Sequence, residues 1–324
     1  MNTIPFYIRA IFLLVFSLSF GKAAQLTLLT HDSFELPKAL LEGFERNNNV
    51  QVNVLKAGDA GQMLNKLILT QGSIADVVYG IDTTLFNKAK TAGILRVETF
   101  KWIATGYVNL NYDKAMKGPL PKRLEDLTSP AYRNMLVVEN PATSSPGLSF
   151  LLSTLHHFGP QKAWEFWAKL RDNGLKVTQG WSQAYYTEFS RNGGHYPLVV
   201  SYASSPAAEV FFSKQKLTQS PTGNLFFVGG VFRQSEGMAV TASSKNVALG
   251  KAFIQFMQSE KVQKQIPTSM WMYPIMPNIS LPDVYRFAQK PVAFYAPEPT
   301  DPLLTQVDAL IQKWNAVVIE RQNP

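Results

Sequence analysis

The chain has 324 residues, of which 46% are hydrophobic and 17% charged, so a disordered state is excluded and about two globular domains are expected. The sequence contains no cysteine, which excludes thiol catalysis, cysteine-bound metals and disulfides. The formal charge is +8, but no run of basic residues is longer than Lys122-Arg123, and we therefore predict no nucleic-acid partner.

Residues 1–23 have the pattern of a secretory signal. Arg9 supplies the positive charge, residues 11–20 form the apolar stretch, and Gly21 and Ala23 are small residues before the expected cleavage point. The apolar stretch is shorter than the ~20 residues that span a bilayer. We expect an exported mature chain with a charge of +6, because Arg9 and Lys22 are removed from the total of +8. An uncleaved anchor helix is the alternative.

The first part of the mature chain alternates between two kinds of pattern. Runs typical of strands occur at 25–29, 51–54 and 74–79, and helical periodicity occurs at 36–46, 61–70 and 83–91. This order predicts right-handed βαβ units and a largely parallel sheet.

The rest of the chain repeats this alternation as a second α/β domain. Strands are predicted at 135–138, 197–202 and 225–231, and helices at 145–158, 161–172, 247–258 and from 302 to about 321. Extended segments at 102–112 and 226–240 lack the composition of a flexible linker. We expect the chain to cross between the domains on these two segments, which would form a hinge over a central cleft.

The residues give little support to metal or catalytic chemistry. None of the four histidines pairs at helical ligand spacing, and there is neither a nucleophile elbow nor a phosphate-binding glycine loop. The sequence therefore predicts no cofactor. Adjacent Tyr185 and Tyr186 could bind Fe(III) through phenolate oxygens, or else one ring packs and the other is exposed.

A candidate anion site lies where the helix at 145–158 begins. Ser144 and Ser145 place hydroxyls beside free backbone N–H groups, and Gly147 would let a ligand approach the backbone. An ordinary helix cap explains Ser145 equally well.

Aromatic residues beside small polar ones form a second candidate group. Trp181, Tyr202 and the pair Trp271 and Tyr273 follow or end strand-like runs, where clefts form in α/β sheets. Such rings can stack on a flat or cationic ligand, although core packing is the commoner role of a tryptophan. Acidic residues could face the ligand cation: Asp32, Asp59, Asp76 and Asp82. Asp32 could instead cap a helix, and Asp76 could be a buried structural residue.

Several strings in the same order resemble the periplasmic thiamine-binding proteins of ABC importers. They include Asp32-Ser33-Phe34, Thr143-Ser144-Ser145-Pro146-Gly147-Leu148, Gly180-Trp181-Ser182, Ser201-Tyr202-Ala203-Ser204-Ser205-Pro206 and Trp271-Met272-Tyr273-Pro274. The resemblance covers nearly the whole mature chain. It implies an α/β, two-lobed type II periplasmic binding protein with a ligand cleft between lobes joined by a strand hinge.

The resemblance also implies boundaries and partners. Lobe 1 would comprise 24–107 and 236–281, lobe 2 would comprise 108–235, and the helical segment 282–324 would pack on the lobes. The periplasmic protein would capture thiamine, a thiamine phosphate or a related small phosphorylated compound without catalysis. It would deliver this ligand to the membrane permease of an ABC importer.

By the resemblance, the hydroxyls of Ser144 and Ser145 and the rings of Trp181, Tyr202 and Trp271 surround the phosphate or hydroxyethyl end and the adjacent ring. Asp32 and Asp59 face the aminopyrimidine or the cationic thiazolium. The implied ligand-binding residues are Asp32, Ser33, Asp59, Asp82, Ser144, Ser145, Gly147, Trp181, Tyr185, Tyr202, Trp271 and Tyr273. Three positions depart from the family pattern, because His31, Lys38 and Ala208 replace aromatics expected around the pyrimidine. An Fe(III) carrier using Tyr185 and Tyr186 and a secreted hydrolase are the alternatives. A thiamine-cleaving enzyme on a related fold uses a cysteine, which this chain lacks.

Overall fold

The structure is a computed structural model that describes residues 23–324. The secretory signal predicted for 1–23 lies outside the described residues except for Ala23, and stays a prediction. Within this range no helix is long and apolar enough to cross a membrane.

The strands form one mixed sheet in the order β2-β1-β3-β9-β4-β7-β5-β6, with β8 and β10 also paired to β4. Three parallel strands lie at one end: β1 (Ala24–Thr30), β2 (Val50–Lys56) and β3 (Val77–Asp82). Three more lie at the other end: β5 (Leu136–Glu139), β6 (Lys176–Thr178) and β7 (Leu198–Tyr202). The short strands are β8 (Thr222–Leu225) and β10 (Tyr273–Pro274).

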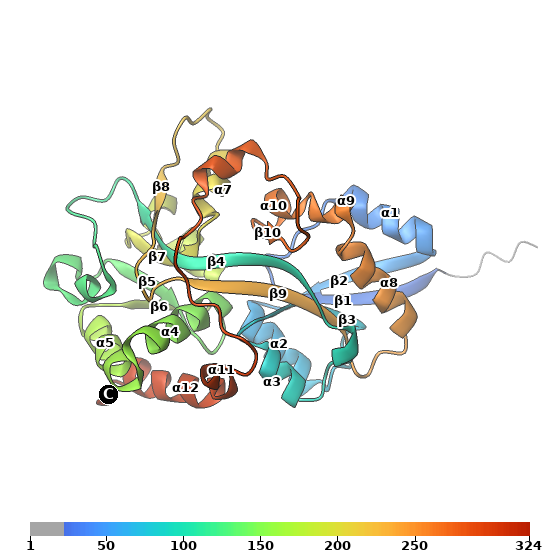
Figure 1. Ribbon diagram of the computed structural model, residues 1–324, viewed down its shortest axis with the longest axis horizontal. Helices are drawn as coiled ribbons and strands as arrows, with labels where there is room; N and C mark the ends of the chain where they lie inside the picture. Colours follow the sequence, from blue (N-terminus) through green and yellow to red (C-terminus); the bar gives the residue numbers. More distant parts are fainter. Residues whose placement is uncertain (1–22) are drawn as a thin grey trace, which may run out of the picture.

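Two long strands connect these groups through the middle of the molecule (Figure 1). Strand β4 (Lys101–Asp113) pairs antiparallel with β9 (Phe232–Val240), in a register from Lys101 opposite Met238 to Val108 opposite Phe232. Strand β9 continues the sheet to β3, and β4 continues it to β7, again antiparallel. The sheet is thus parallel at its ends and antiparallel at its centre. The parallel strands β1, β2 and β3 confirm the parallel sheet predicted for the first part of the chain, whereas the antiparallel centre was not predicted.

The extended segment predicted at 102–112 is confirmed as β4, but the strand predicted at 225–231 is wrong. Only Leu225 of that range belongs to a strand, and β9 begins at Phe232. Phe227 and Val231 are buried by side-chain packing in a loop, which produced an apolar run without strand pairing.

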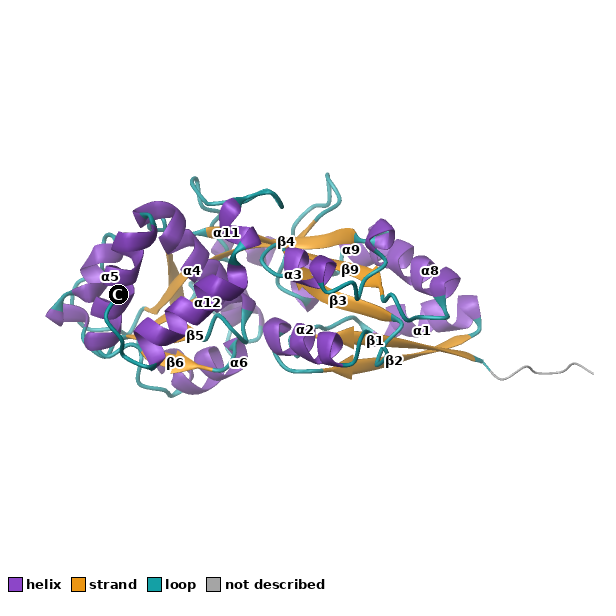
Figure 2. Ribbon diagram, turned by 90° about the horizontal axis from the view of Figure 1, so that it is seen from below, coloured by secondary structure: helices purple, strands orange, loops and turns teal. Residues whose placement is uncertain are grey.

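Helices cover both faces of the sheet (Figure 2). In chain order they are α1 (Lys38–Asn48), α2 (Ala60–Leu69), α3 (Phe86–Thr91), α4 (Ser145–Phe158), α5 (Pro160–Asp172), α6 (Trp181–Gln183), α7 (Ser205–Phe211), α8 (Val247–Met257), α9 (Glu260–Gln263), α10 (Ile266–Ser269), α11 (Pro302–Thr305) and α12 (Val307–Trp314). The single terminal helix predicted from 302 is instead divided into α11, α12 and a π-helical turn at Asn315–Ile319.

The C-terminal segment contacts both ends of the molecule. Trp314 packs edge-on against Trp167 of α5 at 5.7 Å, and the Arg171 Nη1 donates a hydrogen bond to the Val317 carbonyl. Beside α3, the Lys88 Nζ lies 2.9 Å from the Asp308 carboxylate. The C-terminal segment therefore contacts α5 at one end of the sheet and α3 at the other. The division at 24–107, 108–235, 236–281 and 282–324 stays a prediction.

Close packing of α4 on β5 gives a test of the fold. A Cβ added at Gly147 would overlap the Glu139 carbonyl oxygen, whereas one added at Gly43 of α1 would meet no atom within 4 Å. We expect Gly147→Ala to lower the free energy of unfolding by about 1–3 kcal/mol through overpacking. Gly43→Ala, the control, should raise it by up to about 1 kcal/mol through helix propensity. Urea unfolding measures both, and equal effects of the two substitutions would contradict this packing.

Candidate functional site

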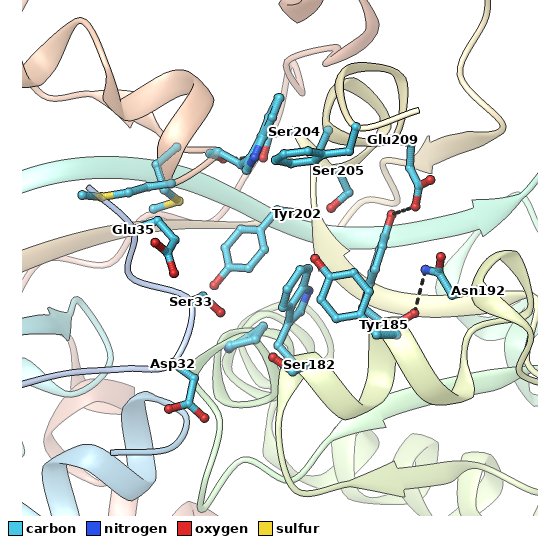
Figure 3. A pocket seen from close by; sticks show the side chains of 18 of the residues that line it. Asp32, Ser33, Glu35, Ser182, Tyr185, Asn192, Tyr202, Ser204, Ser205 and Glu209 are labelled. Carbon is cyan, nitrogen blue, oxygen red and sulfur yellow. Dashed lines mark hydrogen bonds between the residues drawn. The ribbon is translucent and has the colours of Figure 1, made fainter. Parts of the chain in front are cut away.

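A cavity of about 950 Å³ lies between the two ends of the molecule, beside the ends of β1 and β7. Its lining comes from the loop after β1, the start of α2, the segment around α6, the start of α7 and the segment before β10. Figure 3 shows Tyr202 near the middle of this space, with Ser33 and Tyr185 to either side. This is the position at the carboxyl ends of strands where α/β sheets form ligand sites.

The structure brings most of the predicted ligand residues together. The lining includes Asp32, Ser33, Asp59, Ser145, Trp181, Tyr185, Tyr202 and Trp271. Four predicted residues, Asp82, Ser144, Gly147 and Tyr273, are absent from the lining.

Each of these four residues contacts another part of the protein instead, and three of them are described first. Asp82 is buried at the end of β3, where its Oδ1 accepts from the backbone N–H and the hydroxyl of Thr84. The close approach of the Glu139 carbonyl oxygen leaves no room for a Cβ at Gly147, and the predicted ligand role of this glycine stays a prediction. Tyr273 is buried, with its ring against Tyr285.

Ser144 is buried as well, and it belongs to a set of hydrogen bonds centred on Asp59. Asp59 caps α2, accepting from the Ala60 N–H through Oδ1. Its Oδ2 accepts from the Ser144 hydroxyl at 2.6 Å and from the Trp181 N–H at 2.9 Å. One carboxylate therefore joins the start of α2 to the starts of α4 and α6. The resemblance implied that Asp59 and Ser144 face opposite ends of a ligand, whereas the structure binds them to each other.

Aromatic rings form one wall of the cavity. Trp181 stacks on Tyr185 with ring centroids 5.0 Å apart, and the edge of Tyr186 meets it at 5.3 Å. The Trp181 Nε1 donates to the Ser201 hydroxyl at 2.8 Å, and Tyr202 lies 6.5 Å away. The indole orientation is thus fixed by both a hydrogen bond and ring packing before any ligand arrives.

Trp271 also lines the cavity, on a backbone with φ of +55°. This left-handed conformation costs a non-glycine residue roughly 1–2 kcal/mol. The Ser204 hydroxyl donates to the Trp271 carbonyl at 2.5 Å, and the indole lies parallel to the Tyr285 ring at 6.1 Å. Phe212, which is 67% exposed, meets the other side of the ring at 5.5 Å. These contacts hold a strained residue at the cavity rim.

A buried acid–base pair borders the cavity, and it was missed from the sequence. The His31 Nε2 lies 3.5 Å from the Glu236 Oε2, which also accepts from the Tyr79 hydroxyl at 2.8 Å. Burial disfavours the charge on His31, but Glu236 outweighs it and raises the histidine pKa. Burial likewise opposes the charge on Glu236, whereas His31 and Tyr79 lower its pKa. Each partner thus favours the charged form of the other. Glu236 could have been singled out from the sequence, because it is an acidic residue inside the extended segment predicted at 226–240.

The two adjacent tyrosines lie in different environments. The Tyr185 hydroxyl donates to Glu209 at 3.0 Å, and burial, with Glu209 adding to it, raises its pKa well above the usual value. Tyr186 is exposed, with its ring edge-on to Tyr185. In the described part of the chain, no three His, Asp or Glu side chains gather closely enough to hold a metal ion. Deprotonation of Tyr185 to a phenolate ligand is thus disfavoured.

The two-lobed sheet, crossed by β4 and β9 over a cavity, defines a solute-binding protein with the type II periplasmic fold. Residues 74–297 match the family described as bacterial extracellular solute-binding protein. The chain belongs to this family, which confirms the fold class and the solute-binding function predicted from the sequence. Membership implies a small-molecule ligand and, as partner, the permease of an ABC importer.

Curated relatives cover nearly the same length. The thiamine-binding periplasmic protein of Escherichia coli (strain K12) is 31% identical over 315 residues, covering 90% of this chain and 93% of that protein. Its counterpart in Brucella melitensis is 32% identical over 297 residues, covering 82% and 86%.

Solved structures show the same fold. A periplasmic thiamin binding protein matches with a TM-score of 0.79 at 30% identity, covering 91% of this chain and 96% of that one. A ferric binding protein from Campylobacter jejuni has a TM-score of 0.72 at 19% identity, covering 91% and 98%. The second likeness concerns the fold alone.

Asp82 gives a test of the electrostatics beside the site. Burial raises its pKa from 3.8 to about 7, although the Thr84 donors oppose the shift. Between these pH values the native state binds a proton that the unfolded state lacks, so the free energy of unfolding falls as pH rises. We expect Asp82→Asn to remove this slope and to be more stable than the wild type at pH 8, by on the order of 2–4 kcal/mol.

Urea unfolding at pH 4 and pH 8 measures this difference. Asp126→Asn is the control, because Asp126 is only half-buried and the Lys122 N–H lowers its pKa. That variant should gain no stability at pH 8. A parallel pH dependence in Asp82→Asn and the wild type would refute the assignment.

Proposed function

We propose that this chain captures thiamine or a closely related cationic compound in the periplasm and passes it, chemically unchanged, to its permease. The observation that carries the proposal is the wall of stacked aromatic rings facing a cavity whose lining holds more carboxylates than basic groups. The names of the relatives from Escherichia coli and Brucella melitensis support the choice of thiamine. Export through a signal cleaved after Ala23 is part of the proposal.

Aromatic faces and carboxylates both favour a flat cation. Trp181 and Trp271 both line the cavity, and an indole face attracts a cation by about 0.5–2 kcal/mol, more when water is excluded. Carboxylates add a Coulomb attraction for a cation. Asp32 is exposed and lines the cavity, and its Oδ1 accepts a hydrogen bond from the Gly58 N–H. A thiazolium ring fits this combination of an apolar face and a delocalised positive charge.

The architecture allows the two proposed lobes to close around a ligand. The proposed lobes, 24–107 with 236–281 and 108–235, meet at β4 and β9, which act as the hinge. A ligand in contact with both sides stabilises the closed arrangement only by its differential affinity for it. We propose the predicted lining residues as the ligand contacts, with Ser144, Gly147, Asp82 and Tyr273 supporting them from behind.

Three departures from the family pattern limit the pyrimidine contacts. His31 is held by Glu236, Lys38 is 89% exposed in an ion pair with Glu42, and Ala208 is too small to stack. Phe212 and Trp271 border the same cavity. We propose that these two rings take over the stacking role.

Native mass spectrometry tests the identity of the ligand. Protein purified from its host compartment without refolding should carry a bound compound with the mass of thiamine or one of its esters. Adding thiamine to ligand-free protein should restore that mass. A retained compound of unrelated mass, with no shift on adding thiamine, would overturn the proposal.

Substitution of Trp181 tests the aromatic wall. Trp181→Ala should weaken thiamine binding at least about tenfold in calorimetry, because stacking and cation–π attraction are both lost. Trp102→Ala is the matched control, since Trp102 packs on Phe86 and Phe100 outside the cavity lining. The control should leave the affinity within about twofold. Equal losses in both variants would point to a general effect on folding and reject this wall as the binding surface.

A further inference from the structure

A glutamine on one of the two connecting strands has a fully buried side chain. Gln234 lies on β9 opposite Gly106 of β4, and its exposed fraction is 0%. Its backbone carbonyl accepts from the Thr105 hydroxyl at 3.1 Å, so β4 holds this position in place. A buried amide needs partners for both its N–H and its oxygen, because an unpaired polar group costs free energy.

The Gln234 amide bonds three hydroxyl groups that come from α4 and from the end of β7. Its Nε2 donates to the Ser145 hydroxyl at 3.2 Å. Its Oε1 accepts from the Ser149 hydroxyl at 3.3 Å and from the Tyr202 hydroxyl at 3.4 Å. Ser145 and Tyr202 line the cavity, whereas Ser149 is absent from the lining. One buried amide therefore contacts two of the predicted ligand residues from behind.

These hydrogen bonds run in opposite directions for the two hydroxyls that line the cavity. Ser145 accepts from Gln234, so its own proton remains available to donate. Tyr202 donates to Gln234, so its oxygen remains available to accept. Burial, with Glu236 adding to it, raises the pKa of Tyr202 well above the usual value, and the hydroxyl keeps the proton that it donates. The cavity thus offers a donor at Ser145 and an acceptor at Tyr202.

Asp82 is a second group that can receive the Ser145 proton. Its Oδ2 is buried and has no hydrogen-bond partner among the described residues. Burial raises the pKa of Asp82 to about 7, and Ser145 opposes this shift only weakly. A carboxyl group with this pKa is largely uncharged below pH 7, which weakens it as an acceptor. A ligand oxygen in the cavity can therefore compete with Asp82 for the Ser145 proton.

We propose that Gln234 is a positioning residue, which sets the Ser145 hydroxyl as a hydrogen-bond donor and the Tyr202 hydroxyl as an acceptor before a ligand arrives. This inference rests on the proposed function. Thiamine carries a hydroxyl oxygen that can accept and an amino group that can donate, so it would meet both groups already oriented. Binding then loses less free energy to the ordering of side chains.

Calorimetry with thiamine tests the inference through a double-mutant cycle. Gln234→Met replaces the amide with an unbranched apolar side chain of similar size, and it should weaken thiamine binding at least about fivefold. Ser145→Ala should also cost at least about fivefold in the wild type. In the Gln234→Met background, Ser145→Ala should change the affinity less than about twofold, because the hydroxyl has already lost its orientation. Gln234→Leu provides a second background if Gln234→Met is poorly folded.

Ser149→Ala is the matched control, because it removes the third partner of the same amide outside the cavity lining. It should change the affinity less than about twofold in both backgrounds. Unchanged affinity in Gln234→Met, equal losses from Ser145→Ala in both backgrounds, or a loss from Ser149→Ala as large as that from Ser145→Ala would overturn the inference while leaving thiamine binding established. A wild-type protein that binds no thiamine would instead refute the proposed function and the inference with it.

Discussion

The antiparallel pairing of β4 with β9 is the constraint on which the rest of the structure depends. It runs from Lys101 opposite Met238 to Val108 opposite Phe232 and carries the sheet from one lobe into the other. Glu236 lies on β9, and Tyr79 on β3, the other neighbour of β9, donates a hydrogen bond to it. Glu236, which lines the cavity, therefore lies on one of the two strands that connect the lobes, and a change in the register of β9 would displace the charged pair at the same time as the hinge.

Within the cleft, charged and polar groups are bound chiefly to one another. Asp59 binds Ser144 and Trp181, and Arg191 binds Glu209. Buried polar groups without such partners cost free energy, so this network keeps the site ordered without a ligand. What it leaves for a ligand is mainly ring faces and excess negative charge. The same arrangement that organises the site therefore also limits the chemistry of what it can hold.

The sequence predicted local features better than long-range ones. Helices such as α4 and α5 followed from periodicity and from the Pro and Gly residues near their ends, because those signals lie within or next to the element itself. The cap predicted at Ser145 is wrong, since Ser144 is the N-cap of α4 and makes no side-chain cap hydrogen bond. The antiparallel centre of the sheet could not be predicted, since β4 and β9 are more than 100 residues apart and nothing in either strand specifies its partner. His31 and Glu236 were missed as a pair for the same reason. Gly147 was singled out as a position without room for a side chain, which the close Glu139 carbonyl oxygen explains. The sequence could not distinguish this packing from the approach of a ligand, because both require a glycine.

The Tyr79–Glu236 hydrogen bond joins residues separated by 157 positions, and this separation has a consequence during synthesis. At about 5–20 residues per second, β9 emerges from the ribosome roughly 8–30 seconds after β3. Until then β3 has an unpaired edge with apolar Val77 and Val78 beside it, which is a surface prone to aggregation. The nascent chain thus passes through an interval in which its first lobe is unfinished, and this edge is where a chaperone would protect it most usefully.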